Sequence, residues 1–449
     1  MNRWTIHIRK FGKVEKADIE ISPLTLFVGD NNSGKSYVMT LLYGLLNVRF
    51  FFDGYDFDKE SHVYQNCCEI LDRMLQTDSV NEFVLRGEEL TKFEDLINKI
   101  LKKNISRFLR NLFNKEMHVE ELWVTFPPKS ELVFKVCKRM DGDTRKKNIT
   151  LNLKMAANFT QLGYRIREDE LQESENGYPF LLSYIMQSML YSGFGRSKTA
   201  KRVYLPTTRT GFLLTYKTLV GSAVQDKFTM EETTKNLLTR PNSDFLRELS
   251  SMSVNSENPQ FEDEIKFIED CVIAGQVGVS DTQNPDYFYT PLGSDKKLPL
   301  HITSGVVTEM TPLLLFLKYT ELGALMIEEP EISLHPQLQR QIARILIRLV
   351  NKGLPVFATT HSDIIVQHVN NMIKLSEAGQ RDALLKKSDY KQSDLLPRDH
   401  IKVYQFDVEQ GRRTCVHKLP CGDYGFEVMT FYNTLKQLND EIDWIENEE

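Results

Sequence analysis

The stretch that most constrains this chain is Phe27 to Ser36, which reads FVGDNNSGKS and matches the phosphate-binding loop pattern G-x4-G-K-[ST] without a gap. Gly29 and Gly34 let the backbone turn and bring its N–H groups against phosphate oxygens. Lys35 reaches the terminal phosphates, and Ser36 offers its hydroxyl to Mg²⁺. The chain is therefore expected to bind a nucleotide.

The residues around this loop predict the structure that such a loop needs. An apolar strand over 24–28 precedes it, and a helix over 35–47 with apolar residues at helical spacing follows it. A strand, a loop and a helix N-terminus then meet at the phosphates. The predicted nucleotide contacts in this segment are Gly29, Asn31, Asn32, Ser33, Gly34, Lys35, Ser36 and Tyr37.

A second apolar strand, at 322–327, leads into two adjacent carboxylates, Glu328 and Glu329. A phosphate-loop ATPase needs one acid beside the Mg²⁺ shell and one that orients or deprotonates the attacking water. We assign Glu328, together with Ser36, to the metal and Glu329 to the water.

Two further segments complete the predicted site. The strand at 354–359 runs into His361, which is placed to contact a γ-phosphate. Ser304 and Gly305 open an apolar helix, and a helix N-terminus is a phosphate receptor. If this receptor serves the nucleotide of another copy, two chains must sandwich two nucleotides. The predicted catalytic set is Lys35, Glu329 and His361.

These four pieces, in this order, resemble the ATP-binding-cassette (ABC) ATPases of the RecF, SMC and overcoming-lysogenization-defect kind, over roughly 1–48 and 295–370. The resemblance implies an α/β fold, an ABC-type P-loop ATPase head with helical and mixed α/β insertions, and ATP with Mg²⁺ as cofactors. Ser304-Gly305 lacks the Leu-Ser-Gly-Gly-Gln wording of transporters, and Glu328 stands where an aspartate is usual.

Within this class, several segments resemble stand-alone prokaryotic ATPases of antiphage systems, closest to the ATPase subunit of the PARIS system and next to the Septu ATPase. They are 329–331, 334–336, 206–209 and the tail at 425–439. The resemblance implies a homo-oligomeric, ATP-loaded scaffold that senses a phage product and controls a separate nuclease of TOPRIM-like or HNH type.

The pattern along the chain predicts an ATPase head that is interrupted twice. The expected parts are an N-terminal head segment with the phosphate loop, a helical and small-sheet insertion, a return to the head, an acidic helical insertion and a C-terminal head segment: 1–56, 57–195, 196–224, 225–290 and 291–449. Strands at 121–126, 131–137 and 148–154 are expected to share the small sheet. A helix at 337–350 is expected to turn Arg340, Arg344 and Arg348 outward.

Two acid-free basic stretches, 99–115 and 196–217, support an alternative function, a RecF- or SMC-like DNA-maintenance ATPase that clamps duplex DNA. A solvated helix face is the competing interpretation of the first stretch. Arg209, in the second, suits either a phosphate or neighbouring subunit or a structural pairing with a carboxylate. A transporter motor and a slow or inactive ATPase scaffold are further alternatives.

Composition limits these alternatives. The net charge is −6, from 56 basic and 62 acidic residues, which argues against a uniformly basic nucleic-acid binder. The six cysteines lack metal-ligand spacing, so structural roles and a reducing, cytoplasmic setting are expected. No apolar run approaches 18 residues, and no membrane partner is expected.

Overall fold

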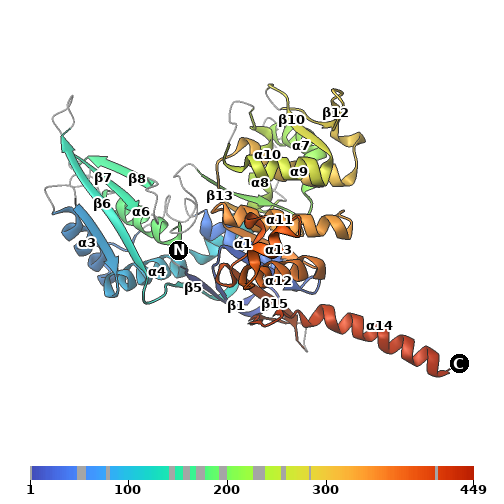
Figure 1. Ribbon diagram of the computed structural model, residues 1–449. Helices are drawn as coiled ribbons and strands as arrows, with labels where there is room; N and C mark the ends of the chain where they lie inside the picture. The colour runs from blue at the N-terminus through green and yellow to red at the C-terminus, as the bar shows by residue number, and fades with distance from the viewer. Residues whose placement is uncertain are drawn as a thin grey trace.

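The computed structural model describes residues 3–47, 57–76, 81–140, 147–154, 162–167, 177–191, 200–225, 238–253, 259–282, 285–409 and 413–448. Its centre is a mixed sheet of nine described strands that draws on both ends of the chain (Figure 1). In spatial order these are β5 (Val119–Thr125), β1 (Thr5–Phe11), β2 (Val14–Glu20), β16 (Thr414–Lys418), β15 (Ile401–Val408), β3 (Leu24–Gly29), β14 (Val356–Thr360), β13 (Leu322–Glu328) and β9 (Lys201–Leu205).

The strands from β15 to β9 run parallel to one another. The register sets Val28 beside Thr360 and Thr359 beside Glu328, so these strands end at the same edge of the sheet. Loops that follow parallel strands at such an edge form ligand sites in α/β proteins. The phosphate loop leaves β3 at this edge, between β14 and β15.

Both faces of the central strands are covered, which explains why these strands are apolar throughout. Phe27 faces one hydrophobic cluster and Val28 faces the other, because successive side chains of a strand point to opposite faces. The Phe27 face carries α1 (Lys35–Leu46), α3 (His62–Leu75), α4 (Glu88–Phe113) and α6 (Gly177–Tyr191). The Val28 face carries α7 (Arg209–Gln225), α8 (Arg240–Ser250), α9 (Glu262–Ile268), α10 (Gly305–Tyr319), α11 (Pro336–Asn351) and α12 (Asp363–Glu377).

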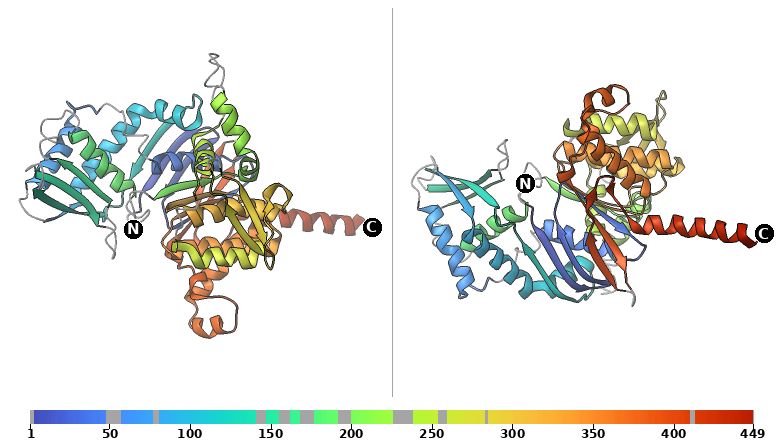
Figure 2. Two further views of the ribbon diagram at one scale, coloured as in Figure 1. Left: turned by 90° about the horizontal axis from the view of Figure 1, so that it is seen from above. Right: turned by 60° about the horizontal axis from the view of Figure 1, so that its bottom comes forward.

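Smaller sheets stand beside this centre. One contains β4 (Asn81–Arg86), β6 (Glu131–Met140), β7 (Lys147–Lys154) and β8 (Leu162–Arg167), and it lies to one side of the molecule with α3 and α6 (Figures 1 and 2). Another contains β10 (Gly275–Val279), β11 (Tyr287–Pro291) and β12 (Leu298–Pro299). The remaining elements are α13 (Arg381–Lys386), the hairpin of β17 (Cys421–Gly422) and β18 (Gly425–Phe426), α14 (Met429–Glu448), the 3₁₀ segments η3 (Pro259–Phe261), η5 (Leu300–Ile302), η6 (Gln392–Asp394) and η7 (Arg398–His400), and the π-helical η4 (Glu269–Ile273).

Three expectations about local structure are wrong. The strand near 121–126 is β5, and it pairs with β1 in the central sheet instead of joining the small sheet. The segment 225–290, which was expected to be helical, also contains β10 and most of β11. Arg344 and Arg348 of α11 are buried, because the carboxylate of Asp394 binds both guanidinium groups.

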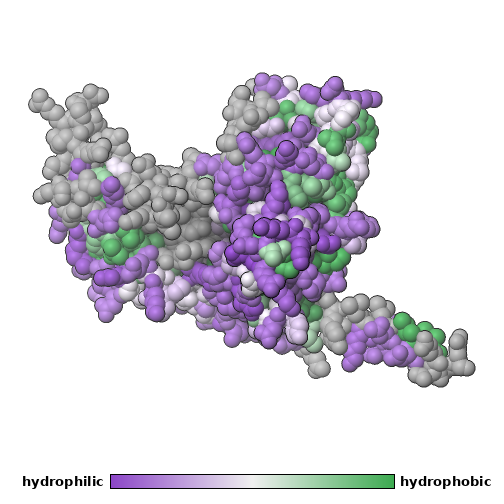
Figure 3. Space-filling view, viewed as in Figure 1, coloured by the Kyte–Doolittle hydropathy of each residue, from purple (hydrophilic) through white to green (hydrophobic). Residues whose placement is uncertain are grey.

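The last helix, α14, leads away from the body in every view (Figures 1 and 2). Apolar side chains gather near its far end, where Ile442, Trp444 and Ile445 are exposed (Figure 3). Among the helices that the structure describes, none is long and apolar enough to cross a membrane.

Candidate nucleotide-binding site

The phosphate loop depends on backbone conformations that favour glycine. Gly29 has φ of 130°, and a Cβ atom at this position would lie 2.5 Å from the carbonyl oxygen of Phe406 on the neighbouring β15. Gly34 has φ of 98°, and its Cβ would lie 2.8 Å from the side chain of Val14. A larger residue at either position would displace the loop from the sheet edge.

Lys35 is folded back into this loop and is only 5% exposed. Its Nζ donates to the carbonyl oxygens of Gly29, at 3.0 Å, and Asp30, at 2.6 Å, and to Ser33 Oγ at 3.2 Å. Burial lowers the pKa of Lys35 to about 8, although the nearby carboxylates, Glu329 foremost, oppose this shift. The ammonium group is thus held at the place where a phosphate would lie, in a position to exchange loop oxygens for phosphate oxygens.

Glu328 ends β13 inside the sheet edge, where it is 7% exposed. Its Oε2 accepts from the backbone N–H and the hydroxyl of Thr207, both at 3.2 Å. Its Oε1 is buried, and the buried Tyr204 hydroxyl lies against this carboxylate. A carboxylate is a hard oxygen ligand that suits Mg²⁺, so this side chain fits a place in a metal shell.

Glu329 and His361 face each other across the ends of β13 and β14. His361 Nε2 lies 3.7 Å from Glu329 Oε1, and the Glu329 backbone N–H donates to the Thr359 carbonyl at 3.0 Å. Glu329 has φ of 43°, a conformation that is uncommon outside glycine. Burial raises the pKa of Glu329, with Glu328 adding to the shift, while burial and then the Lys35 ammonium lower the pKa of His361. The histidine is therefore neutral near pH 7.

Glu331 is a part of the site to which the sequence analysis gave no role. Its Oε1 accepts from the backbone N–H of His361 at 2.6 Å and from the hydroxyl of Thr360 at 2.9 Å. Burial raises the pKa of this carboxyl group. The position of Glu331 in the sequence, two residues after Glu329 and separated from it by Pro330, could have indicated a role in this site. Glu331 fixes the strand end that carries the histidine.

Arg209 has a structural pairing, which decides between the two interpretations of this residue. It is 1% exposed, and its Nε lies 2.9 Å from a carboxylate oxygen of Glu309. Its other nitrogens donate to the backbone carbonyls of Glu328, at 2.7 Å, and Glu329, at 3.1 Å. Arg209 therefore holds the backbone that presents the acid pair, and its donors face the protein interior.

The remaining predicted contacts lie at two different places. The Tyr37 ring follows the loop and packs on Phe11 and Phe113, each at 5.9 Å between ring centres, while part of it is exposed. Asn31, Asn32 and Ser36 are exposed along the loop, and Ser33 is buried. Ser304 and Gly305 are exposed at the N-terminus of α10, where Gly305 approaches Ser333 and not the phosphate loop of its own chain.

In the second basic stretch, 196–217, the two lysines that the structure describes are paired with acids. Lys201 pairs with Glu248, and Lys217 pairs with Asp286. Arg196 and Lys198 lie outside the described residues. The first stretch lies on α4, whose basic side chains are exposed while its apolar stripe is buried. Lys99 and Arg110 of this stretch pair with Asp58 and Glu116, and the exposed basic face of α4 is one candidate surface for nucleic acid.

The family described as "AAA ATPase domain" matches residues 4–178 and 215–366, a range that includes the phosphate loop, the acid pair and His361. The chain belongs to this family. Membership implies ATP as the nucleotide, usually with Mg²⁺. The predicted α/β fold of a P-loop ATPase is confirmed.

SMC heads are among the solved structures to which the chain shows a weak similarity. The SMC head domain from Thermotoga maritima is 12% identical with a TM-score of 0.35, and the match covers 94% of this chain and 100% of that one. An SMC head of Pyrococcus furiosus with an extended coiled coil, bound to the C-terminal domain of ScpA, is 12% identical with a TM-score of 0.38, at 98% and 99% coverage. No curated protein matches this sequence.

Proposed function

We propose that this AAA ATPase-domain protein binds and hydrolyses ATP, with Glu329 as the group that orients or deprotonates the attacking water. The observation that carries the proposal is the meeting of Lys35, Glu328 and the Glu329–His361 pair at one sheet edge. Lys35 binds the terminal phosphates, and neutral His361 stands beside Glu329 to contact the γ-phosphate. Ser36 and Glu328 would hold Mg²⁺, which supplies positive charge against the phosphate oxygens.

We infer further that the active form contains more than one copy. Gly305 and Ser304 cap a 15-residue helix that begins at the surface, and its exposed N-terminus fits the phosphates of a nucleotide held by a second chain. ATP bound at the loop of one copy would then complete its site at α10 of the next.

Glu329→Gln is the variant that tests this proposal. It should bind ATP as the wild type does and hydrolyse it about 10²-fold to 10³-fold more slowly, since it loses a general base but no phosphate contact. Turnover by phosphate release and native mass by light scattering, each with ATP and Mg²⁺, measure both parts. An ATP-stabilised oligomer is expected, and Gly305→Glu should abolish it while leaving ATP binding intact. Unchanged turnover in Glu329→Gln would exclude the assigned role.

We propose that the oligomer acts as a sensor and scaffold in antiphage defence and controls a separate nuclease. The support is the likeness of the 329–336 and 206–209 segments to such ATPases. Phage plating on cells that carry this gene and a neighbouring nuclease gene, compared with cells that carry Lys35→Ala, tests it. Equal plating on both strains would refute this role.

The DNA-clamp alternative would use the exposed basic face of α4. It predicts DNA binding that weakens steeply with salt and with Lys102→Ala/Lys103→Ala.

A further inference from the structure

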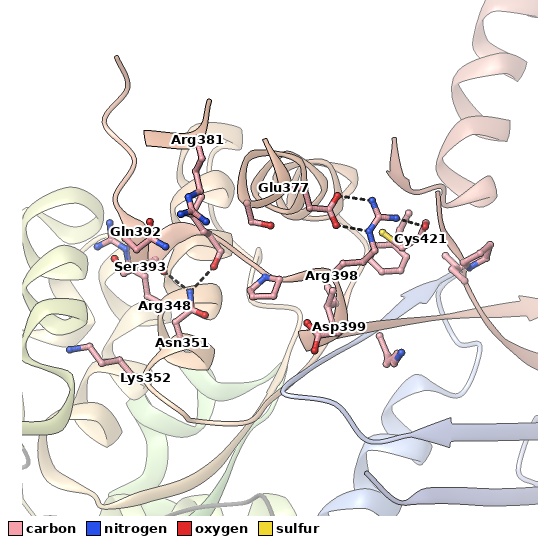
Figure 4. A pocket seen from close by; sticks show the side chains of 18 of the residues that line it. Arg348, Asn351, Lys352, Glu377, Arg381, Gln392, Ser393, Arg398, Asp399 and Cys421 are labelled. Atoms are coloured by element: carbon pink, nitrogen blue, oxygen red, sulfur yellow. Dashed lines mark hydrogen bonds and ion pairs between the residues drawn. The ribbon is translucent and has the colours of Figure 1, made fainter. Parts of the chain in front are cut away.

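Figure 4 shows the residues around a cavity of about 930 Å³. The cavity lies at the opposite end of the central strands from the phosphate loop. Its walls come from the ends of α11 and α12, from α13, η6 and η7, from the start of β15 and from the end of β16 with the turn into β17. Cavities of this size are typical of sites for small organic ligands.

The register of the sheet separates this cavity from the nucleotide site. Ile401 of β15, which lines the cavity, pairs with Leu24 of β3, whereas Phe406 pairs with Gly29 at the phosphate loop. Five residues of extended strand span about 16 Å. A ligand in the cavity would thus be held apart from ATP at the loop, on the same pair of strands.

The walls are rich in positive charge. Six lysine or arginine side chains line the cavity against two acidic ones: Arg348, Lys352, Arg381, Arg398, Lys402 and Lys418, with Glu377 and Asp399. Two of these cations, Arg398 and Arg348, are already bound by carboxylates of the protein. Arg398 is held by both carboxylate oxygens of Glu377, at 2.7 and 2.8 Å, and by the carbonyl of Cys421 (Figure 4), and Arg348 is bound by buried Asp394.

Lys402 and Lys418 differ from these, because their ammonium groups lie beside each other on neighbouring strands. Lys418 Nζ binds Glu20 at 2.7 Å, and the Arg3 guanidinium lies 3.8 Å from both Glu20 and Asp399. Burial lowers the pKa of Lys402, and Lys418 and Arg3 lower it further against the attraction of Glu20. Three cations therefore share two carboxylates, and a surplus of positive charge remains at this wall.

Apolar side chains form another part of the wall. Leu395, Leu419 and Phe426 line the cavity, and Leu395 and Phe426 are buried in the core below it. A ligand that fits both parts has an anionic group and a less polar body. Because a phosphate carries up to two charges and several acceptor oxygens, it matches two adjacent ammonium groups better than a single carboxylate does.

We propose that this cavity binds a small phosphorylated organic molecule of nucleotide to dinucleotide size. Its phosphate lies on Lys402 and Lys418, and its body lies against Leu395, Leu419 and Phe426.

The test uses the full chain with Lys35→Ala, which weakens phosphate binding at the loop; any binding that remains at the loop should not respond to changes at Lys402 and Lys418. Calorimetric titrations with AMP, a 5′-phosphorylated dinucleotide and inorganic pyrophosphate are compared with adenosine, which has no phosphate. At least one phosphorylated organic probe should bind, and adenosine should not. Adding Lys402→Ala/Lys418→Ala should weaken this binding at least about tenfold, because charged hydrogen bonds are lost.

The matched control is Lys386→Ala/Lys387→Ala, which removes the same charge from exposed positions outside the cavity and should leave binding unchanged. If the double alanine variant does not fold, Lys402→Gln alone replaces it, with the same direction expected. Binding of no organic probe, binding that survives loss of both lysines, or binding only of long single-stranded DNA would each overturn the proposal.

Discussion

The two ends of the central strands carry opposite charge. At the carboxyl ends, Glu328, Glu329 and Glu331 surround one buried lysine, Lys35. At the amino ends, lysine and arginine side chains outnumber acids around the cavity. The cations at the cavity are partly exposed, with 39% of the Arg398 side chain and 47% of the Lys418 side chain accessible, so solvent screens part of their charge. One end of the strands thus gathers carboxylates around a buried lysine, whereas the other end presents partly exposed cations to a cavity.

The largest expected effect is on the free energy of unfolding, and it distinguishes one arginine at each end of the central strands. Arg209 and Arg398 each bind one carboxylate and backbone carbonyls, but Arg209 is 1% exposed and the Arg398 side chain is 39% exposed. Arg209→Met should lower the free energy of unfolding by about 3–5 kcal/mol, because it leaves Glu309 buried without its partner.

Arg398→Met is the matched variant at the other end. It should leave the urea midpoint nearly unchanged, because solvent screens an exposed ion pair. Equal shifts of the midpoint in the two variants would remove the distinction between a buried and an exposed pairing.

His368 on α12 is expected to make the stability of the protein depend on pH. Burial lowers its pKa to about 4, and Arg340 and Arg344 add to the shift. Below pH 6.5 the unfolded chain binds a proton at this residue that the folded chain does not bind until about pH 4. His368 therefore costs about 2–3 kcal/mol of stability as the pH falls through this window.

His368→Met removes the titrating ring while keeping a buried apolar side chain. The loss of stability between pH 6.5 and 4.5, measured by urea unfolding, should be smaller in this variant than in the wild type. Parallel curves for the two proteins would show that the pKa of His368 is not lowered in the folded protein.

A smaller effect, on the affinity for ATP, is expected from the titration of Lys35. Its pKa is about 8 in the nucleotide-free protein, and bound phosphates favour the charged ammonium. Above pH 8, ATP must bind together with a proton, so its affinity should fall about tenfold between pH 7 and pH 9. Titrations with a fluorescent ATP analogue measure this fall. Lys35→Ala provides the control, and any residual affinity in it should show no break near pH 8.

The sequence was most informative where the signal is local. The strand, the loop and Lys35 are contiguous, and the acids and His361 each follow an apolar strand directly, so the order of elements was sufficient to place them at one edge. The α/β fold of a P-loop ATPase followed from the same segments.

Long-range pairing explains what the sequence did not predict. Arg344 and Arg348 lie on the polar side of the α11 pattern, and nothing near them indicates that Asp394, 50 and 46 residues away, buries them. The sequence of β5 does not reveal which sheet the strand joins, and its pairing with β1 places it in the central sheet. The cavity likewise joins several separate segments between Arg348 and Phe426, and no local pattern indicates that they meet.

The position of β3 in the sheet also determines when the protein becomes competent during synthesis. This strand leaves the ribosome near the start of translation, but its two neighbours are β14 and β15, which end at Thr360 and Val408. Because these neighbouring strands are far from β3 in the sequence, the central sheet is expected to form slowly and late. We expect nascent chains to retain ATP only when they are stalled beyond β15, and a series of stalled chains would locate this point.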